Sequence, residues 1–126
     1  FSEIEGFREL DQRRFDFTKG WIEVETGLTK HGVVARIKAR SEQEIGIALE
    51  FDPEALDPVG FTQLPGSASQ LFLARGRVEL SHSGEMKYEI YLARKGMADA
   101  PIRVAINSPD GVLDGVLRTG AAGPRN

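Results

Sequence analysis

The sequence predicts an all-β protein, an antiparallel β-sandwich of about seven or eight strands. Two observations carry this prediction. From Phe15 onward apolar and polar residues alternate with a period of two, and turn-forming residues recur between the alternating stretches. Side chains of a half-buried strand point alternately to the core and to solvent, which produces this period. A closed β-barrel would give the same pattern and is the alternative architecture.

Length and composition fit one domain with its own core. The chain has 126 residues, of which 40% are hydrophobic and 28% charged, and it has no cysteine. The absence of cysteine excludes disulfides, thiol catalysis and thiolate metal sites. We expect the sandwich to occupy residues 15–119, a helix or arm to precede it over residues 1–14, and residues 120–126 to form a disordered tail.

Charge and hydropathy argue against two classes of partner. The net charge is −3, whereas nucleic-acid binding uses a basic surface, and no apolar run reaches the ~20 residues that cross a bilayer. We therefore expect neither nucleic-acid binding nor membrane insertion. The chain begins with Phe1 rather than methionine, which predicts a processed or trimmed N-terminus. This slightly favours an extracytoplasmic location, and the compartment is otherwise undetermined.

The first residues predict a short helix. Ser2 and Glu5 match a capping box, and apolar residues follow at spacings of three. We expect a helix over about residues 3–13. Because Gly6 disfavours a helix, an additional strand is the alternative.

Two alternating stretches in the middle of the chain predict two β-hairpins. In the first, the strands 33–39 and 45–51 bury their odd-numbered residues. A three-residue loop over 41–43 keeps both apolar sets on one face. This register places Arg40 opposite Glu44, a favourable pair of charges.

The second hairpin is predicted within residues 78–92, where the even-numbered residues are mostly apolar. With Gly84 as the third loop residue, glycine takes the position that favours a left-handed backbone, and Glu79 faces Lys87. His82 then lies at a solvent-exposed turn tip. This position argues against a catalytic or metal-binding role for the histidine.

Further strands are predicted where β-branched and aromatic residues lie between turn formers. The expected strands are 21–25, 71–74, 102–106 and 112–117. The expected turns are a type I turn at 108–111 and a single helical turn at 52–56 that Asp52 caps. Residues 57–70 are expected to be irregular.

The number and spacing of the strands resemble an immunoglobulin-like sandwich. The disulfide and tryptophan hallmark of antibody domains is missing, because the chain has no cysteine. The resemblance therefore implies an architecture and not membership of that family.

Few residues have the spacing of a reaction site. Glu23 and Glu25 lie two apart on one predicted strand and would project to one face about 7 Å apart. Two carboxylates at this separation can bind calcium or flank a glycosidic bond, but a solvated strand face is the simpler explanation. The sequence has no nucleophile elbow and no phosphate-binding glycine motif. We expect no metal and no cofactor.

Surface recognition is the remaining class of function. Tryptophan, tyrosine and arginine carry much of the binding energy where a surface loses its water. Trp21 is expected on the outer face of its strand beside Glu23 and Glu25, and Tyr91 is expected outside, opposite Arg75. These five are the predicted ligand-binding residues.

The sequence thus favours a non-catalytic binding or assembly module that recognises a protein or glycan partner. An exposed edge strand would also allow a homodimer. Two alternatives belong to other classes. One is a small β-barrel that carries an apolar ligand, and the other is a glycoside hydrolase that uses Glu23 and Glu25 as its carboxylates.

Overall fold

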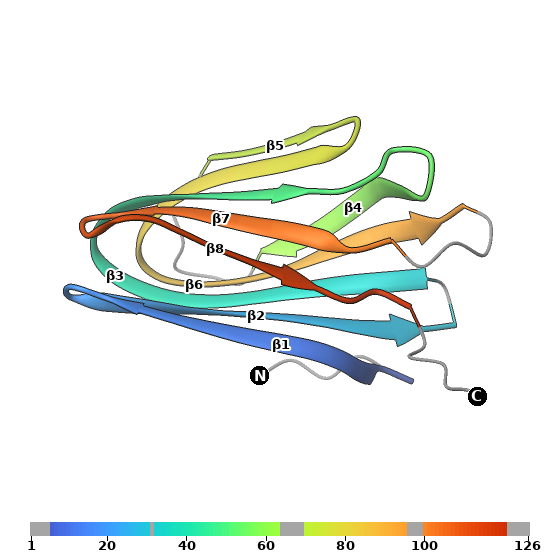
Figure 1. The fold of residues 1–126 in the computed structure, drawn as a ribbon, viewed down its shortest axis with the longest axis horizontal. Helices are drawn as coiled ribbons and strands as arrows, with labels where there is room; N and C mark the ends of the chain where they lie inside the picture. The colour runs from blue at the N-terminus through green and yellow to red at the C-terminus, as the bar shows by residue number, and fades with distance from the viewer. Residues whose placement is uncertain (1–5, 31, 64–69, 96–99, 121–126) are drawn as a thin grey trace.

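The structure, a computed structural model, describes residues 6–30, 32–63, 70–95 and 100–120. These residues form antiparallel strands and no helix (Figure 1). The strands are β1 (Arg8–Phe17), β2 (Gly20–Thr29), β3 (Gly32–Glu50), β4 (Leu56–Gln63), β5 (Gln70–Ala74), β6 (Arg77–Arg94), β7 (Ile102–Ser108) and β8 (Gly111–Leu117). The all-β antiparallel class expected from the sequence is confirmed.

All the strands belong to one sheet that bends over itself and does not close. The 19-residue β3 and the 18-residue β6 pair along most of their length and curve together (Figure 1). We call half-sheet A the part formed by β1, β2 and β4 with residues 32–41 and 84–94. Half-sheet B consists of β5, β7 and β8 with residues 45–50 and 77–82. The two long strands therefore connect the half-sheets.

Both predicted hairpin loops are wrong, because each is a bend inside a continuous strand. Ser41 lies opposite Gly84 and Ile45 opposite His82, so that three residues of β3 match one of β6. Strands that pass from one layer to another commonly turn the corner through such irregularities. The turn chemistry is nevertheless present, since Gly84 has the left-handed backbone that was expected (φ 86°). The predicted cross-strand partner of Arg40 is wrong, because Arg40 lies opposite Glu85 and not opposite Glu44.

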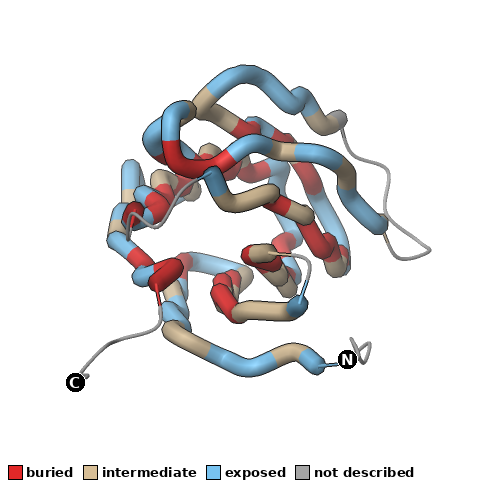
Figure 2. The backbone as a smooth tube through the Cα atoms, turned by 90° about the vertical axis from the view of Figure 1, so that its right-hand side faces the viewer, coloured by how far each residue is buried: buried red, intermediate tan, exposed pale blue. Residues whose placement is uncertain are grey.

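The predicted inward faces of these strands are confirmed. Apolar residues of both long strands are buried in one core cluster, whose other members come from both half-sheets (Figure 2). The buried members from the long strands are Val33, Ala35, Ile37, Ala39, Ile45, Ile47, Leu49, Val78, Leu80, Met86, Tyr88, Ile90 and Leu92. In a β3–β6 ladder the side chains of each strand alternate between the two faces of the sheet just as they would in two separate hairpins. The ladder therefore buries the same residues.

The N-terminal helix is contradicted over the described residues. β1 begins at Arg8 and pairs with β2, with a register shift between Glu9 and Asp11. Pairing along β2 satisfies the backbone groups of this segment, and it overrides a helical propensity that a glycine already weakened. Residues 1–5 lie outside the described part of the chain.

The stretch expected to be irregular contains β4. Its register shifts between Pro58 and Gly60, as expected for proline on an edge strand. The helical turn before β4 is confirmed, because Leu56 N–H donates to Asp52 O (3.0 Å) and Glu54 N–H to the Asp52 carboxylate (2.9 Å). The predicted tail lies outside the described residues beyond residue 120.

Side chains tie the β1 and β8 edges together without strand pairing. The turn that was expected at Ser108 to Gly111 presents Asp110, whose carboxylate accepts hydrogen bonds from Thr18 N–H (2.8 Å) and the Thr18 hydroxyl (2.7 Å). At the other end of the strands, Arg118 N–H donates to Asp11 (2.9 Å). These contacts hold the outer edges of the two half-sheets near each other.

We expect Asp110→Ala to lower the free energy of unfolding by about 1–2 kcal/mol, because the backbone N–H and hydroxyl of Thr18 both lose a charged acceptor. Urea unfolding measures this change. Asp114→Ala on the exposed face of β8 removes the same charge and is the matched control, expected within about 0.5 kcal/mol of the parent. Equal stability of the two variants would contradict the role of Asp110.

Candidate ligand-binding faces

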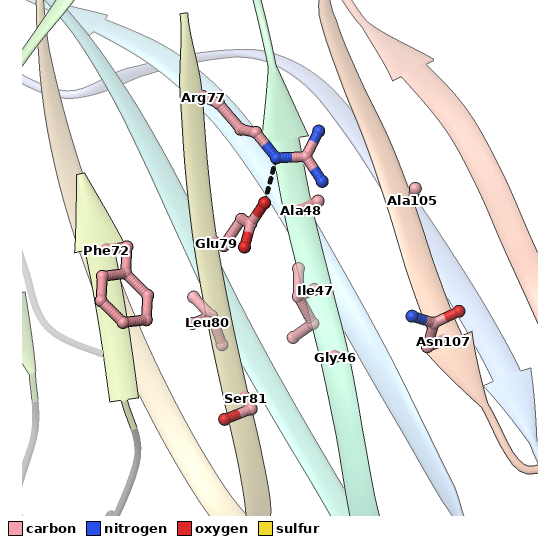
Figure 3. A pocket seen from close by; sticks show the side chains of 10 residues that line it. All are labelled: Gly46, Ile47, Ala48, Phe72, Arg77, Glu79, Leu80, Ser81, Ala105 and Asn107. Carbon is pink, nitrogen blue, oxygen red and sulfur yellow. Dashed lines mark hydrogen bonds and ion pairs between the residues drawn. The ribbon is translucent and has the colours of Figure 1, made fainter. Parts of the chain in front are cut away.

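Half-sheet B carries small residues at neighbouring positions of its outer face. Gly46 and Ala48 lie on β3, and opposite them lie Ser81 of β6 and Ala105 of β7, respectively. Together they line a groove of about 280 Å³ that runs across the strands (Figure 3). The groove exists because side chains on this part of the sheet are short.

Larger side chains stand around this groove. Phe72 of β5, with 65% of its surface exposed, lies on one side, and Asn107 of β7 lies on the other (Figure 3). Arg77 forms ion pairs with Glu79 and Glu50 near one end. The groove therefore offers an aromatic ring, an amide and a charged pair to a bound molecule.

Half-sheet A has a different outer face, which contains the predicted Trp21, Glu23 and Glu25. Ile22 and Val24 between them are fully buried, so the three residues project outward together as expected. The side chains on this face are long and form ion pairs across the strands. The pairs are Arg14–Glu23 (2.8 Å), Arg36–Glu25 (3.5 Å) and Arg40–Glu85 (3.8 Å).

Trp21 borders a second hollow on this face. The Arg14 guanidinium lies 4.9 Å from the centre of its ring, a cation–π distance. A cavity of about 490 Å³ is lined by Trp21 together with Lys38, Arg40 and Lys87, among others. The indole thus combines a stacked arginine with an adjoining space that is rich in cations.

Glu25 has the most perturbed carboxyl on this face. Its pKa is raised to about 7, first by burial and then by a hydrogen bond with Glu9 and the negative charges of Glu9 and Glu23, while Arg36 opposes the shift. Phe7 covers this region, because its ring lies 4.4 Å from the Arg36 guanidinium. Near neutral pH the Glu25 carboxyl therefore holds a proton for part of the time.

This shift predicts how stability depends on pH. A carboxyl whose pKa is higher in the folded than in the unfolded state stabilises the fold fully below its unfolded pKa, and that stability is lost as the pH rises toward about 7. Glu25→Gln keeps the shape of the protonated form and cannot ionise. We expect the variant to match the parent at about pH 4 and to be more stable at about pH 8, as measured by urea unfolding. A pH dependence identical to that of the parent would contradict this account.

The predicted pairing of Tyr91 with Arg75 is wrong. Tyr91 lies on half-sheet A, where its hydroxyl bonds to Thr62 (2.7 Å) and donates to Glu89 (3.1 Å). Arg75 lies in the turn between β5 and β6 and forms an ion pair with Glu54 (2.5 Å). The mistake follows from the hairpin, since a continuous β6 moves Tyr91 away from that turn. The five predicted ligand-binding residues are thus not one cluster.

The predicted position of His82 is also wrong. It is only 1% exposed and lies at the bend of β6 instead of at a turn tip. Burial lowers its pKa, and hydrogen bonds with the backbone of Gly84 and Glu85 act in the opposite direction. Within the described residues no cluster of three or more histidine or acidic side chains could hold a metal ion, and no helix is long and apolar enough to span a membrane.

Sequence reasoning missed the groove of half-sheet B. The only signal was that outward positions of two predicted strands hold Gly46, Ala48 and Ala105, where polar residues are usual. Ser81 directly precedes the three-residue loop that was predicted to end at Gly84. Ser81 lies next to Gly46 only because β3 pairs with β6. That pairing was not predicted from the sequence.

Comparison with known proteins supports the fold and assigns no function. No protein-family model matches the chain, and no curated protein matches it. A solved chain described as "BspA_C_WT" is 10% identical over 91% of this chain and 50% of its own length, with a TM-score of 0.52.

A second solved chain comes from the "Complete structure of manganese lipoxygenase of Gaeumannomyces graminis and partial structure of zonadhesin of Komagataella pastoris". It is 13% identical over 82% of this chain and 46% of its own length, with a TM-score of 0.47. This protein spans about half the length of each of the two. At 10% identity, the similarity to the chain described as "BspA_C_WT" supports the all-β antiparallel fold alone.

Proposed function

We propose that this protein is a non-catalytic recognition module that binds a glycan in the groove of half-sheet B. The observation that carries the proposal is the hollow itself. Gly46, Ala48, Ser81 and Ala105 leave about 280 Å³ of space on a sheet face, next to an exposed Phe72. This volume lies near the lower end of the range for small-molecule sites, about 300–1,000 Å³.

Gly46 supports a ligand role because the fold does not require glycine there. An added β-carbon would meet only Asn107, at 3.7 Å, which is an ordinary contact. Gly46 is also not among the glycines with a left-handed backbone. Glycine inside a strand weakens it by about 0.5–1 kcal/mol, and it often marks a place where a ligand or another backbone approaches closely.

The chemistry of the groove fits a sugar chain. A sugar ring has flat faces of C–H groups, which pack on an aromatic ring such as Phe72, and hydroxyl edges, which exchange hydrogen bonds with amides and carboxylates. Asn107 and Glu79 supply such groups at the groove. A protein partner would also use the exposed Val112 and Val116 of β8, and it is the alternative occupant.

The finer architecture and assembly belong to the same proposal. We propose that the half-sheets form a β-sandwich of immunoglobulin-like type, which is a common scaffold for recognition. The single core cluster shared by both half-sheets supports this arrangement. Dimerisation through an exposed edge strand stays a prediction.

Filling the groove tests the proposal. We expect Ala48→Val to abolish binding of neutral oligosaccharides, because two extra methyl groups occupy the hollow, while stability stays equal or rises since valine suits strands. The probes are cello-, malto- and chito-oligosaccharides, and calorimetry reports binding. Ala74→Val is the matched control, because Ala74 is exposed on the same half-sheet and does not line the groove. Parent binding that survives in Ala48→Val would contradict the groove as the site.

One observation favours a hydrolase as a second candidate. The raised pKa of Glu25, about 7, suits a general acid, and Glu23 lies on the same face. Loss of glycoside turnover in Glu25→Gln is the result expected of this candidate, and absence of turnover in the parent would contradict it. A carrier of an apolar ligand also stays a prediction, and extraction of the native protein into organic solvent would release its cargo.

A further inference from the structure

The edges of the sheet differ in how well they are protected from pairing with another chain. Among the described residues the edge strands are β1, β4, β5 and β8. The backbone N–H and C=O groups of an open edge pair readily with another extended chain, and proteins block them with charged residues, proline, register shifts or covering contacts. β1 and β8 cover each other, because Arg13 donates to Val116 O (3.4 Å) and Arg118 donates to Leu10 O (2.9 Å). That side of the molecule is therefore protected.

Among these edges only β5 lacks such protection. β4 has Asp57, Pro58 and a register shift. β5 has the sequence QLFLA, with no charge and no proline, and it pairs with β6 without a register shift. No other strand of the described residues pairs with β5, which is the uppermost strand in Figure 1. Its Phe72 is 65% exposed and its Leu73 39%. The free edge of β5 is therefore open to a further strand.

Exposed apolar side chains gather on the same side of the molecule. β4 and β5 pair with different parts of β6, along the edge of β6 that faces away from β3. Of the six large apolar residues that are exposed within the described part of the chain, two lie on β8 and four on these two strands. The four are Val59, Phe61, Phe72 and Leu73. Apolar residues that are exposed together on one side of a protein indicate an interaction surface.

The β5 strand is complementary to a second copy of itself. When two β5 strands pair antiparallel, their core-side residues stay on one face only if the two-fold axis passes through a residue. With the axis at Phe72, all of β5 is paired, and Leu71 faces Leu73 of the second copy on the side of the sheet that carries the core. An axis at Leu73 pairs fewer residues of β5 and sets Leu71 opposite Arg75. Strand length and side-chain chemistry therefore favour the same register.

We propose that two copies of this protein pair through β5 in an antiparallel, two-fold symmetric dimer, which joins their half-sheets B into one sheet with the axis at Phe72. The dimer covers the free edge of β5 with backbone hydrogen bonds, and it brings the two exposed Phe72 rings together on the outer face. Pairing of one surface with itself is the commonest way in which proteins form dimers.

The proposal rests on the assembly part of the function proposed above, and it specifies the strand, the register and the partner. Phe72 also borders the groove of half-sheet B. The two grooves therefore lie next to each other on one face of the dimer. Two adjacent sites on one face increase the affinity for a chain that is long enough to reach both.

Sedimentation equilibrium of the whole chain, without sugar, tests the dimer. Because the interface is small, we expect a dissociation constant on the order of 100 µM. In Phe72→Lys the new lysine lies opposite Glu79 of its own chain, a favourable pair, but it meets the lysine of the second copy at the axis. We expect dimerisation at least about tenfold weaker, with an equal or higher thermal unfolding midpoint. Val112→Lys changes an equally exposed residue of β8 and should dimerise as the parent does.

Cysteine trapping tests the register. The chain has no cysteine, and residues directly opposite on antiparallel strands are close enough for a disulfide. Phe72→Cys should form a covalent dimer under mild oxidation, because residue 72 meets its own copy at the axis. Ala74→Cys is the matched control, since residue 74 is also exposed on β5. Its copy lies about 13 Å away along the strands, so this variant should stay monomeric.

Three results would overturn the proposal. They are a parent that stays monomeric at about 1 mM, equal dimerisation of the parent and Phe72→Lys, and a cross-link through residue 74 in place of residue 72. These measurements use no sugar, and Ala48→Val, which fills the groove, should still dimerise. Failure of the dimer therefore leaves the glycan test unaffected, and failure of glycan binding leaves the dimer test unaffected.

Discussion

The pairing of β3 with β6 is the constraint on which the rest of the structure depends. The two strands pair from Val33 opposite Leu92 to Glu50 opposite Arg77, and their register shifts only where both bend, between Ser41 and Ile45. Every other strand of the described residues pairs with one of these two, or with a strand that does. The bend therefore determines how the half-sheets meet and which side chains share the core.

One bent ladder also produces two unlike outer faces. On half-sheet A, the outward positions of β3 are occupied by long charged residues, among them Arg36, Lys38 and Arg40, which alternate with acids on neighbouring strands. On half-sheet B, the outward positions of the same strand hold Gly46 and Ala48, and the face is hollow. A change in side-chain length along one strand thus separates a charged surface from an open groove. The two half-sheets therefore present surfaces of different chemistry.

Local alternation predicted which side chains are buried, but it could not predict which strands are partners. The odd residues of 33–39 and 45–51 and the apolar even residues of 78–92 were assigned correctly to the core, because alternation depends only on the strand itself. The partner depends on contacts far apart in the sequence. Both a hairpin and a long-range ladder satisfy the same parity, and turn formers such as Gly84 serve a bend as well as they serve a hairpin. The choice between them displaced His82 and Tyr91 from their expected surroundings, and it hid the groove, whose lining comes from four strands.

Disulfide trapping tests the β3–β6 ladder most directly, because the chain has no cysteine of its own. Residues directly opposite on antiparallel strands lie within the Cα distance that a disulfide spans. With Lys38 and Lys87 both replaced by cysteine, we expect a cross-link to form in the folded protein under mild oxidation, whereas cysteines at 79 and 87, which face each other only in a local hairpin, should stay reduced. Cross-linking of the 79–87 pair in place of the 38–87 pair would contradict the account.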